Sequence, residues 1–305
     1  MSDDPLVSVI TIFLNAERFL EEAIASVCAQ SYPHWELLLV DDGATDASSA
    51  IARRHADARP ERVRYLQHPG RANLGMSAAR NLGLHAARGD FVAFLDADDV
   101  WRESKLTIQV DALRRHPTAA LVYGPTQLWY SWTGKPEDFA RDRPRLLGVP
   151  ADTVRTPPEM IPRFLRGDAQ APSTCCALIR RSVALAIGGF EERFRGMYED
   201  QAFFFKVFLR YPTYVMGAVL DRYRQHPDSA SATALRDGSY HYRHPSEAQR
   251  VFLEWLEGHL IATGVGDAAV RRALRDARRP YRHPFLRRLR GFASSAAARL
   301  GARPR

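Results

Sequence analysis

The feature that most constrains the fold is a regular alternation of short apolar runs with helical patterns over the first 125 residues. Between the runs, apolar residues recur at helical spacing, for example at Leu20, Ile24 and Val27. Strands that alternate with helices in this way are typical of β-α-β units. The sequence therefore predicts an α/β fold with a Rossmann-like, mostly parallel central sheet flanked by helices. The expected strands lie at residues 7–12, 35–40, 63–67, 91–95 and 120–124.

Residues between the strands indicate where the helices begin and end. Asn15 can cap the first helix, and Asp46 can cap a second helix that runs to about residue 58. A helix over residues 76–87 would end at Gly89, because glycine readily adopts the left-handed conformation that follows many helices.

The second half of the chain is less regular. Residues 125–172 crowd prolines, arginines and tryptophans together without a clear period, so we expect long surface loops there. Regular pattern returns with a strand at 174–179, an apolar helix at 199–210, strands near 214–224 and helices after residue 247.

Positive charge is concentrated at the C-terminal end. The formal net charge is +8, but residues 271–305 hold twelve arginines and one acid, a local charge of +11, so residues 1–270 sum to −3. Nucleic-acid binding would call for basic residues among aromatics across a folded face, so we expect no nucleic-acid partner. Two interpretations of the basic segment stay open: peripheral contact with an anionic membrane surface, or a solvated tail.

Other features indicate the compartment. No run of about 18 apolar residues is present, and the first residues lack the basic segment of a signal peptide. The three cysteines are odd in number, and two of them are neighbours, which does not favour a disulfide framework. We expect a cytoplasmic protein, peripheral at the inner face of the membrane if its basic segment binds lipid.

Acidic residues gather where two of the predicted strands end. Asp41 and Asp42 end the second strand, and Asp96, Asp98 and Asp99 follow the fourth. The carboxyl ends of parallel strands face one crevice, in which ligands bind. Two carboxylates about 5 Å apart repel by roughly 3 kcal/mol at an effective dielectric near 20, so such a cluster needs solvent or a cation. The residues alone fit either solvated turn acids, with Asp99 as a helix cap, or a divalent cation completed by a bound diphosphate.

Taken in order, these motifs resemble those of family 2 glycosyltransferases with the GT-A fold. The resemblance rests on VSVITIFLNAERFLEEAIASVCAQSYPHWELLLVDDGATDAS and GMSAARNLGLHAARGDFVAFLDADDVW. It continues more loosely through Gly188–Phe190, Glu199-Asp200 and Tyr223–Pro227, and covers about two-thirds of the 305 residues. It implies an inverting transferase that moves a sugar from a nucleoside diphosphate to a glycan, lipid-linked or other hydroxyl acceptor in polysaccharide or cell-surface glycan synthesis. The implied cofactor is Mn2+ or Mg2+.

The resemblance assigns one group of residues to the nucleotide part of the donor. Among them, Asp42 would accept a hydrogen bond from the base, Arg80 would approach the base and diphosphate, and Asp96 would contact the ribose or the metal. UDP is the expected nucleotide. GDP and dTDP are alternatives, because Leu14 stands where many relatives have an aromatic residue that can stack on the base. The group comprises Thr11, Phe13, Asn15, Asp42, Arg80 and Asp96.

A second group would bind the metal and transfer the proton. By resemblance, Asp98 binds the metal directly, and His226 lies near the metal and the diphosphate. Asp200 would be the general base that takes the acceptor hydroxyl's proton, with Glu199 as the alternative carboxylate. The residues alone also fit acids at a helix N-terminus and a structural histidine.

In this interpretation residues 1–125 form the donor-binding half, and residues 126–235 form the acceptor-binding and catalytic-base half of the same domain. Residues 236–305 form C-terminal helices and a basic tail. The alternatives are a nucleotide-sugar hydrolase, a nucleotidyltransferase or a non-catalytic nucleotide-binding module that uses the same crevice. A nucleotidyltransferase would usually show a loop rich in glycine and lysine after the first strand, and residues 13–17 contain neither.

Overall fold

The computed structural model describes residues 4–241 and 244–282. Among them an eight-stranded sheet forms the centre, in the order β3-β2-β1-β4-β10-β6-β11-β9. Its strands are β1 (Val7–Phe13), β2 (Trp35–Asp41), β3 (Val63–Gln67), β4 (Phe91–Phe94), β6 (Leu121–Tyr123), β9 (Thr153–Arg155), β10 (Ala177–Arg180) and β11 (Thr213–Val215).

Most strand pairs in this sheet are parallel. β1 pairs in parallel with β2 and β4, β2 with β3, and β6 with β11. β10 is antiparallel to both of its neighbours, and β9 is antiparallel to β11. The predicted α/β fold with a mostly parallel sheet is therefore confirmed.

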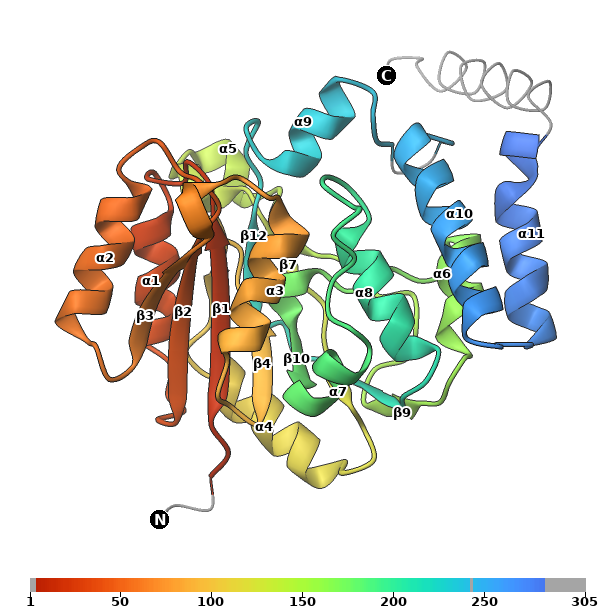
Figure 1. Cartoon of the computed structure of the whole chain (residues 1–305), viewed down its shortest axis with the longest axis horizontal. Helices are drawn as coiled ribbons and strands as arrows, with labels where there is room; N and C mark the ends of the chain where they lie inside the picture. The colour runs from red at the N-terminus through yellow and green to blue at the C-terminus, as the bar shows by residue number, and fades with distance from the viewer. Residues whose placement is uncertain (1–3, 242–243, 283–305) are drawn as a thin grey trace.

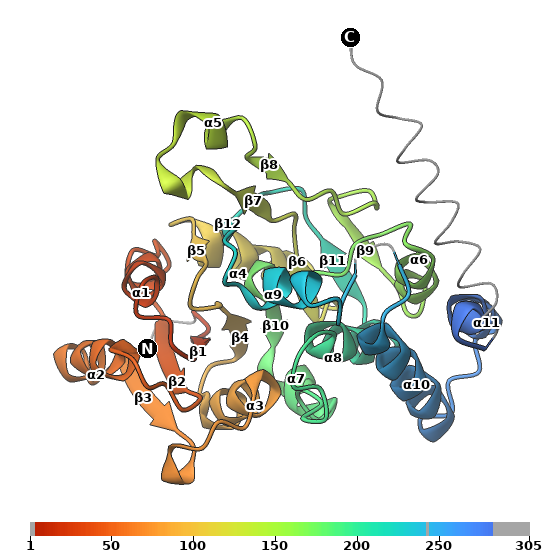
Figure 2. The same ribbon diagram turned by 90° about the horizontal axis from the view of Figure 1, so that it is seen from above.

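Helices cover both faces of the sheet (Figure 2). Side chains alternate between the faces along each strand, so Val9 packs in the core under one helical layer and Ile10 in the core under the other. The first layer contains α1 (Leu20–Cys28), α2 (Ser48–Ala58) and α4 (Lys105–Arg115). The second contains α3 (Met76–Ala86), α7 (Arg181–Ala186) and α8 (Glu199–Phe208).

A second, four-stranded sheet lies beside the first and has the order β5-β12-β7-β8. Two of its strands fall within residues 125–172, so the expectation of loops alone over that stretch was wrong. Strands of two or three residues are too short to produce a hydrophobic period, which explains why the sequence pattern missed them. The elements are β5 (Val100–Trp101), β7 (Gln127–Trp129), β8 (Arg143–Pro144) and β12 (Asp221–Arg224), with α5 (Pro136–Phe139) and α6 (Met160–Arg166) nearby in the chain.

The C-terminal helices are α9 (Ala230–Arg236), α10 (Glu247–Ala262) and α11 (Ala268–Arg282). In Figure 1, α9 lies at the top of the molecule, whereas α10 and α11 lie at the opposite side of the molecule from α2. α11 contacts α6 and α10, and its Val270 and Leu274 are buried in the core with Phe252 of α10. The predicted C-terminal helical extension is confirmed.

The packing of α11 bears on the basic segment. Its larger apolar side chains, Val270 and Leu274, are already covered by the rest of the protein. Arg271, Arg272 and Arg275 are exposed. No helix within residues 4–241 and 244–282 combines the length and the hydropathy needed to cross a bilayer. The rest of the predicted basic tail, residues 283–305, lies outside the described residues.

Candidate active site

A cavity of about 1000 Å³ lies at the carboxyl ends of β1, β2 and β4. Its walls come from the loops after these strands, the N-terminus of α8 and the segment that follows β12. It brings together residues that are far apart in the sequence, as expected for the crevice at the edge of such a sheet. The predicted site residues that line it are Phe13, Asn15, Asp42, Arg80, Asp96, Asp98, Glu199, Asp200 and His226.

Thr11 is the predicted site residue that the structure does not bring to the cavity. Its side chain is 1% exposed within β1, and its hydroxyl has no hydrogen-bond partner among the described residues. The strand continues for two more residues, so Ile12 and Phe13 reach the cavity instead.

Asn15 connects two loops rather than capping a helix. It adopts a left-handed conformation, with φ of 49°. Its side-chain oxygen accepts hydrogen bonds from the backbone N–H of Thr45 (2.8 Å) and from the Thr45 hydroxyl (3.2 Å). α1 begins five residues later at Leu20, so the prediction of a cap was wrong. Asn15 instead fixes the loop after β1 against the loop after β2.

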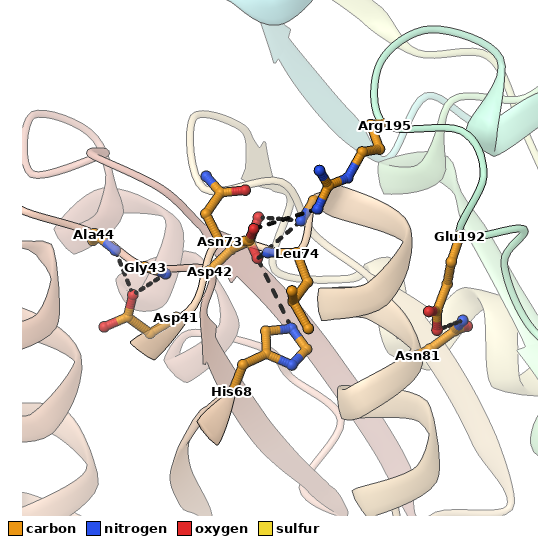
Figure 3. A network of polar contacts seen from close by, with 11 residues as sticks. Asp41, Asp42, Gly43, Ala44, His68, Asn73, Leu74, Asn81, Glu192 and Arg195 are labelled. Atoms are coloured by element: carbon orange, nitrogen blue, oxygen red, sulfur yellow. Dashed lines mark hydrogen bonds and ion pairs between the residues drawn. The ribbon is translucent and has the colours of Figure 1, made fainter. Parts of the chain in front are cut away.

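The neighbouring acids Asp41 and Asp42 have different surroundings, which Figure 3 shows. One Asp41 oxygen accepts the N–H groups of Gly43 and Ala44, and the other accepts the hydroxyls of Ser49 and Tyr65. Burial tends to raise the pKa of Asp41, but these hydrogen bonds lower it below its ordinary value. Asp41 therefore orders the loop, and only its neighbour faces the cavity.

Asp42 lines the cavity at the end of β2. Its carboxylate accepts the N–H groups of Leu74 (2.9 Å) and Gly75 (3.0 Å), and it lies 3.9 Å from Nε2 of His68 (Figure 3). With three N–H contacts to two oxygens, the carboxylate keeps a free lone pair for a donor group on a ligand. Asn73 and Leu14 line the cavity beside it.

Arg80 of α3 is the cation at the centre of the site. It is 3% exposed, and its guanidinium donates to Asp96 (2.8 Å) and to Glu199 (3.1 Å). Burial tends to lower the pKa of Arg80, but Asp96 and Glu199 raise it above its ordinary value, so the group stays charged. The other Asp96 oxygen accepts the hydroxyl of Thr174 at 2.8 Å. Arg80 thus joins the acidic turn after β4 to the start of α8.

Asp98 and His226 form the contact most suited to a cation. The Asp98 carboxylate lies 2.9 Å from Nε2 of His226, and its side chain is 25% exposed toward the cavity. Nδ1 of His226 is buried without a partner in the described chain. Within residues 4–241 and 244–282, no three His, Cys, Asp or Glu side chains group into a closed metal site. One or two protein ligands suffice for Mg2+ bound to substrate phosphates, so these residues fit a cation shared with a diphosphate.

Asp99 accepts a hydrogen bond from the backbone of β12 and does not cap a helix. It is fully buried, and one of its oxygens accepts the N–H of Arg224 at 2.9 Å. Burial, followed by the charges of Asp98 and Asp96, raises the pKa of Asp99 well above its usual range, which favours the neutral acid. Interpreting Asp99 as a helix cap was therefore wrong.

Asp200 and Glu199 occupy the first turn of α8. Burial and the Asp200 charge raise the pKa of Glu199 to about 7. Burial also raises the pKa of Asp200, opposed by the Gln201 N–H group and by the charges of Arg80 and Arg145. Both carboxyl groups therefore hold their protons more tightly than exposed acids do.

The residue before this pair is strained. Tyr198 has a φ of 76°, an unusual conformation for a large side chain. Its ring is stacked on Phe252 of α10 (5.0 Å between centroids) and meets the edge of Tyr240 (5.6 Å). α10 and the loop before it therefore hold the backbone that leads into the first turn of α8, where Asp200 lies.

Two residues that lie beside the predicted site residues, Arg145 and Arg224, were missed in the sequence. Thr174 binds Asp96, and Arg145 lines the cavity near Asp200. Arg224 is buried, and its Nε donates to the backbone oxygen of Asp98 at 2.7 Å. For Arg224 a signal existed, since it stands two residues before His226 in the same motif. Arg145 showed no pattern, whereas Thr174 lies in the segment that was expected to form a strand at 174–179.

Comparison with known proteins decides the family. Residues 8–188, more than half of the chain, match the family model described as Glycosyl transferase family 2. The chain belongs to glycosyl transferase family 2. The predicted resemblance is thereby confirmed.

Curated relatives match over the N-terminal part. The putative teichuronic acid biosynthesis glycosyltransferase TuaG of Bacillus subtilis (strain 168) is 41% identical over 117 residues, which are 38% of this chain and 44% of TuaG. The UDP-Glc:alpha-D-GlcNAc-diphosphoundecaprenol beta-1,3-glucosyltransferase WfgD of Escherichia coli is 36% identical over 122 residues, 40% of this chain and 46% of WfgD. The chain thus spans less than half the length of these family 2 relatives.

Solved structures share the fold over more of the chain. The mannosyltransferase PcManGT from Pyrobaculum calidifontis, in complex with GDP-Man and Mn2+, has a TM-score of 0.63 at 20% identity and covers 98% of this chain and 77% of its own. S. aureus TarS 1-349, in complex with UDP-GlcNAc, has a TM-score of 0.61 at 20% identity and covers 81% of this chain and 65% of its own. At these identities the likeness establishes the fold.

Proposed function

We propose that the protein is an inverting glycosyltransferase that moves a sugar from a nucleoside diphosphate to an acceptor hydroxyl in polysaccharide or cell-surface glycan synthesis. The observation that carries this proposal is the meeting of three kinds of group in one cavity: Asp42 at its base-binding end, the Asp98–His226 pair, and Asp200 at the start of α8. Family membership supports the same chemistry.

Donor binding uses the ends of the first two strands. Asp42 has a lone pair free to accept a hydrogen bond from the base, and Phe13, Leu14 and Asn15 form the adjoining wall. The guanidinium of Arg80 donates a hydrogen bond to the Asp96 carboxylate and so holds Asp96 in position to contact the ribose. UDP is favoured, and GDP is the first alternative, because the relatives named above include proteins bound to UDP-GlcNAc and to GDP-Man.

Asp98 and His226 would hold a divalent cation, Mn2+ or Mg2+, together with oxygens of the donor diphosphate. Such a cation supplies positive charge that stabilises the departing nucleoside diphosphate. A structurally similar transferase binds Mn2+ with its donor, which supports this assignment. Asp99 keeps the acidic turn in place behind Asp98 and His226, because it accepts a hydrogen bond from the backbone N–H of Arg224. Its raised pKa favours the neutral acid, which adds no further negative charge there.

Asp200 would act as the general base. It lines the cavity, and its position at the start of α8 is held from behind by the packing of Tyr198. As the acceptor oxygen attacks the anomeric carbon, its proton passes to the Asp200 carboxylate, and the bond to the diphosphate breaks. The raised pKa makes this carboxylate a stronger base than an exposed aspartate.

The acceptor is proposed to be a glycan or a lipid-linked sugar. WfgD, whose name gives a sugar diphosphoundecaprenol as its acceptor, supports the lipid-linked alternative. A cytoplasmic reaction, with the exposed arginines of α11 at the inner face of the membrane, stays a prediction of the sequence.

The test is a thermal-shift panel of UDP-, GDP- and dTDP-sugars with Mn2+ and with a chelator. A ligand that binds only the folded state raises Tm by mass action, so one donor should raise it in the presence of metal. Product analysis with that donor then separates transfer from hydrolysis. No shift for any nucleotide sugar, with or without metal, would refute the proposal.

A further inference from the structure

Two arginines at the outer edge of the second sheet line the cavity, at the strand farthest from β5. They are Arg143 of β8 and Arg145, which follows it. We propose that these two side chains form a subsite for an anionic group, a phosphate or a carboxylate, carried by the acceptor. The inference rests on the proposed transfer reaction and names the class of acceptor.

The position of β8 separates this subsite from the donor. In the order β5-β12-β7-β8, β5 follows the Asp96–Asp99 turn directly and β8 is the outermost strand. At about 4.8 Å for each strand spacing, β8 lies roughly 14 Å from β5 and about 10 Å from β12, which His226 follows. Arg143 and Arg145 therefore line the cavity wall opposite the acidic turn, where a second ligand can bind beside a donor held at Asp98 and His226.

The two guanidiniums share one side of the chain. Residues two apart in an extended segment project to the same face. Arg143 pairs in register with Leu128 of β7, and both of these residues line the cavity, as does Arg145. The edge strand thus presents two cations side by side toward the acceptor end.

Neither arginine forms an ion pair among the described residues, although Arg145 lies within electrostatic range of Asp200. Arg143 donates to the backbone oxygen of Arg141 at 3.1 Å, and Arg145 donates to the side-chain oxygen of Gln170 at 2.8 Å. Both of these acceptors are neutral. By contrast, Arg141 in the same segment forms an ion pair with Asp138 at 2.6 Å. Most of the donors on Arg143 and Arg145 are free, in the planar arrangement that binds phosphate or carboxylate in bidentate fashion.

The subsite also lies within electrostatic range of the proposed base. Arg145 is one of the cations that lower the pKa of Asp200 against the effect of burial. An acceptor whose hydroxyl meets Asp200 would therefore extend its next substituents toward Arg145. A negative group there would be neutralised by the two guanidiniums, and it would not suppress ionisation of the base.

The test measures anion binding with the donor site filled. Wild-type protein is saturated with Mn2+ and the nucleotide found in the donor panel, and hexyl phosphate and glucuronate are each titrated by calorimetry. The Arg143→Gln/Arg145→Gln variant should bind the preferred anion about tenfold or more weakly, because charge-assisted hydrogen bonds are lost. Arg115→Gln, which removes an exposed charge paired with Asp111 on α4, is the matched control and should bind as wild type does.

Kinetics with paired acceptors then separate binding from catalysis. Each assay compares a pair of acceptor glycosides, one neutral and one that differs only by an added phosphate or carboxylate. The double variant should raise KM for the charged member about tenfold and leave KM for the neutral member unchanged. Any change in kcat that follows the loss of Arg145 beside Asp200 should affect both members equally. Lysine at both positions should restore part of the loss in KM. Equal affinity in the double variant, or no anion binding by wild type, would overturn the inference. Nucleotide binding is measured in the same samples, so its absence would instead count against the proposed transferase.

Discussion

Replacement of Arg80 by methionine tests the charge network at the centre of the site. Arg80 is 3% exposed and donates to Asp96 at 2.8 Å and to Glu199 at 3.1 Å. Methionine keeps much of the apolar stem but leaves two carboxylates without their cation. Loss of one partner from a buried ion pair typically destabilises a protein by about 3–5 kcal/mol, and we expect Arg80→Met to fall in this range.

The expected change is large enough to measure directly. A loss of about 3–5 kcal/mol corresponds to a fall in Tm of roughly 5–8 °C, at an entropy of unfolding of about 2.1 cal/mol/K per residue over 305 residues. Urea denaturation followed by circular dichroism gives the free energy of unfolding. Arg115→Met is the control, because its pair with Asp111 is exposed, with side-chain exposures of 63% and 59%, and should contribute less than about 1 kcal/mol.

A second variant distinguishes lost charge from lost packing. Glu199→Gln removes one of the two negative charges that Arg80→Met leaves behind, so the double variant should be more stable than Arg80→Met alone. The reasoning would be refuted if Arg80→Met cost less than about 1 kcal/mol, or if the added Glu199→Gln change lowered stability further.

Three further predictions concern the base and its support. Asp200→Asn should lower kcat by about 10²–10⁴-fold while the Kd for the nucleotide stays nearly constant; a fully active Asn variant would remove the assignment. Phe252→Ala removes the ring stacked 5.0 Å from Tyr198 and should cost about 3–5 kcal/mol in urea denaturation. It should also lower kcat in protein that is still folded, and an unchanged kcat would contradict the role of α10 in holding the base. Because burial raises the pKa of Glu199 from 4.5 to about 7, the folded protein binds this proton more tightly than the unfolded chain does, so stability should fall as pH rises across that interval. The free energy of unfolding, measured at several pH values, should depend less steeply on pH in Glu199→Gln than in wild type. The same pH dependence in both proteins would contradict the raised pKa.

The sequence was informative where apolar runs are long and buried on both faces. β1 and β2 have seven residues each, all of them buried, so their ends could be located closely. Once the strands are placed, parallel pairing brings their carboxyl ends to one edge. That is why Asp42 and Asp98 could be expected in one cavity from local sequence alone.

Features that depend on contacts between distant segments could not be predicted from the sequence. β8 has only two residues, and its place beside β7 follows from the packing of the second sheet. Arg143 and Arg145 therefore appeared only as arginines in an irregular stretch. The support of Tyr198 by Phe252 joins residues more than fifty positions apart and leaves no local pattern.

Gly89 was predicted to end a helix in the left-handed conformation, but the structure requires glycine there for a different reason. Glycine after a helical pattern was expected to adopt the left-handed conformation, but Gly89 is not among the residues with positive φ, and α3 already ends at Ala86. A Cβ atom at this position would lie 2.6 Å from the backbone oxygen of Leu6 and 2.7 Å from the backbone nitrogen of Ser8. The requirement is close approach of two segments, which spacing in the sequence does not reveal.

The central claim is that a cation at Asp98 and His226 binds the donor's diphosphate. Calorimetry of UDP and GDP binding, with Mn2+ and with a chelator, tests it on wild type and on Asp98→Asn, with the exposed Asp111→Asn as the control. We expect Mn2+ to strengthen binding of one nucleotide to wild type and to the control by about tenfold or more, equivalent to about 1.4 kcal/mol, and to have little effect on Asp98→Asn. The same metal-dependent gain in Asp98→Asn would contradict the claim.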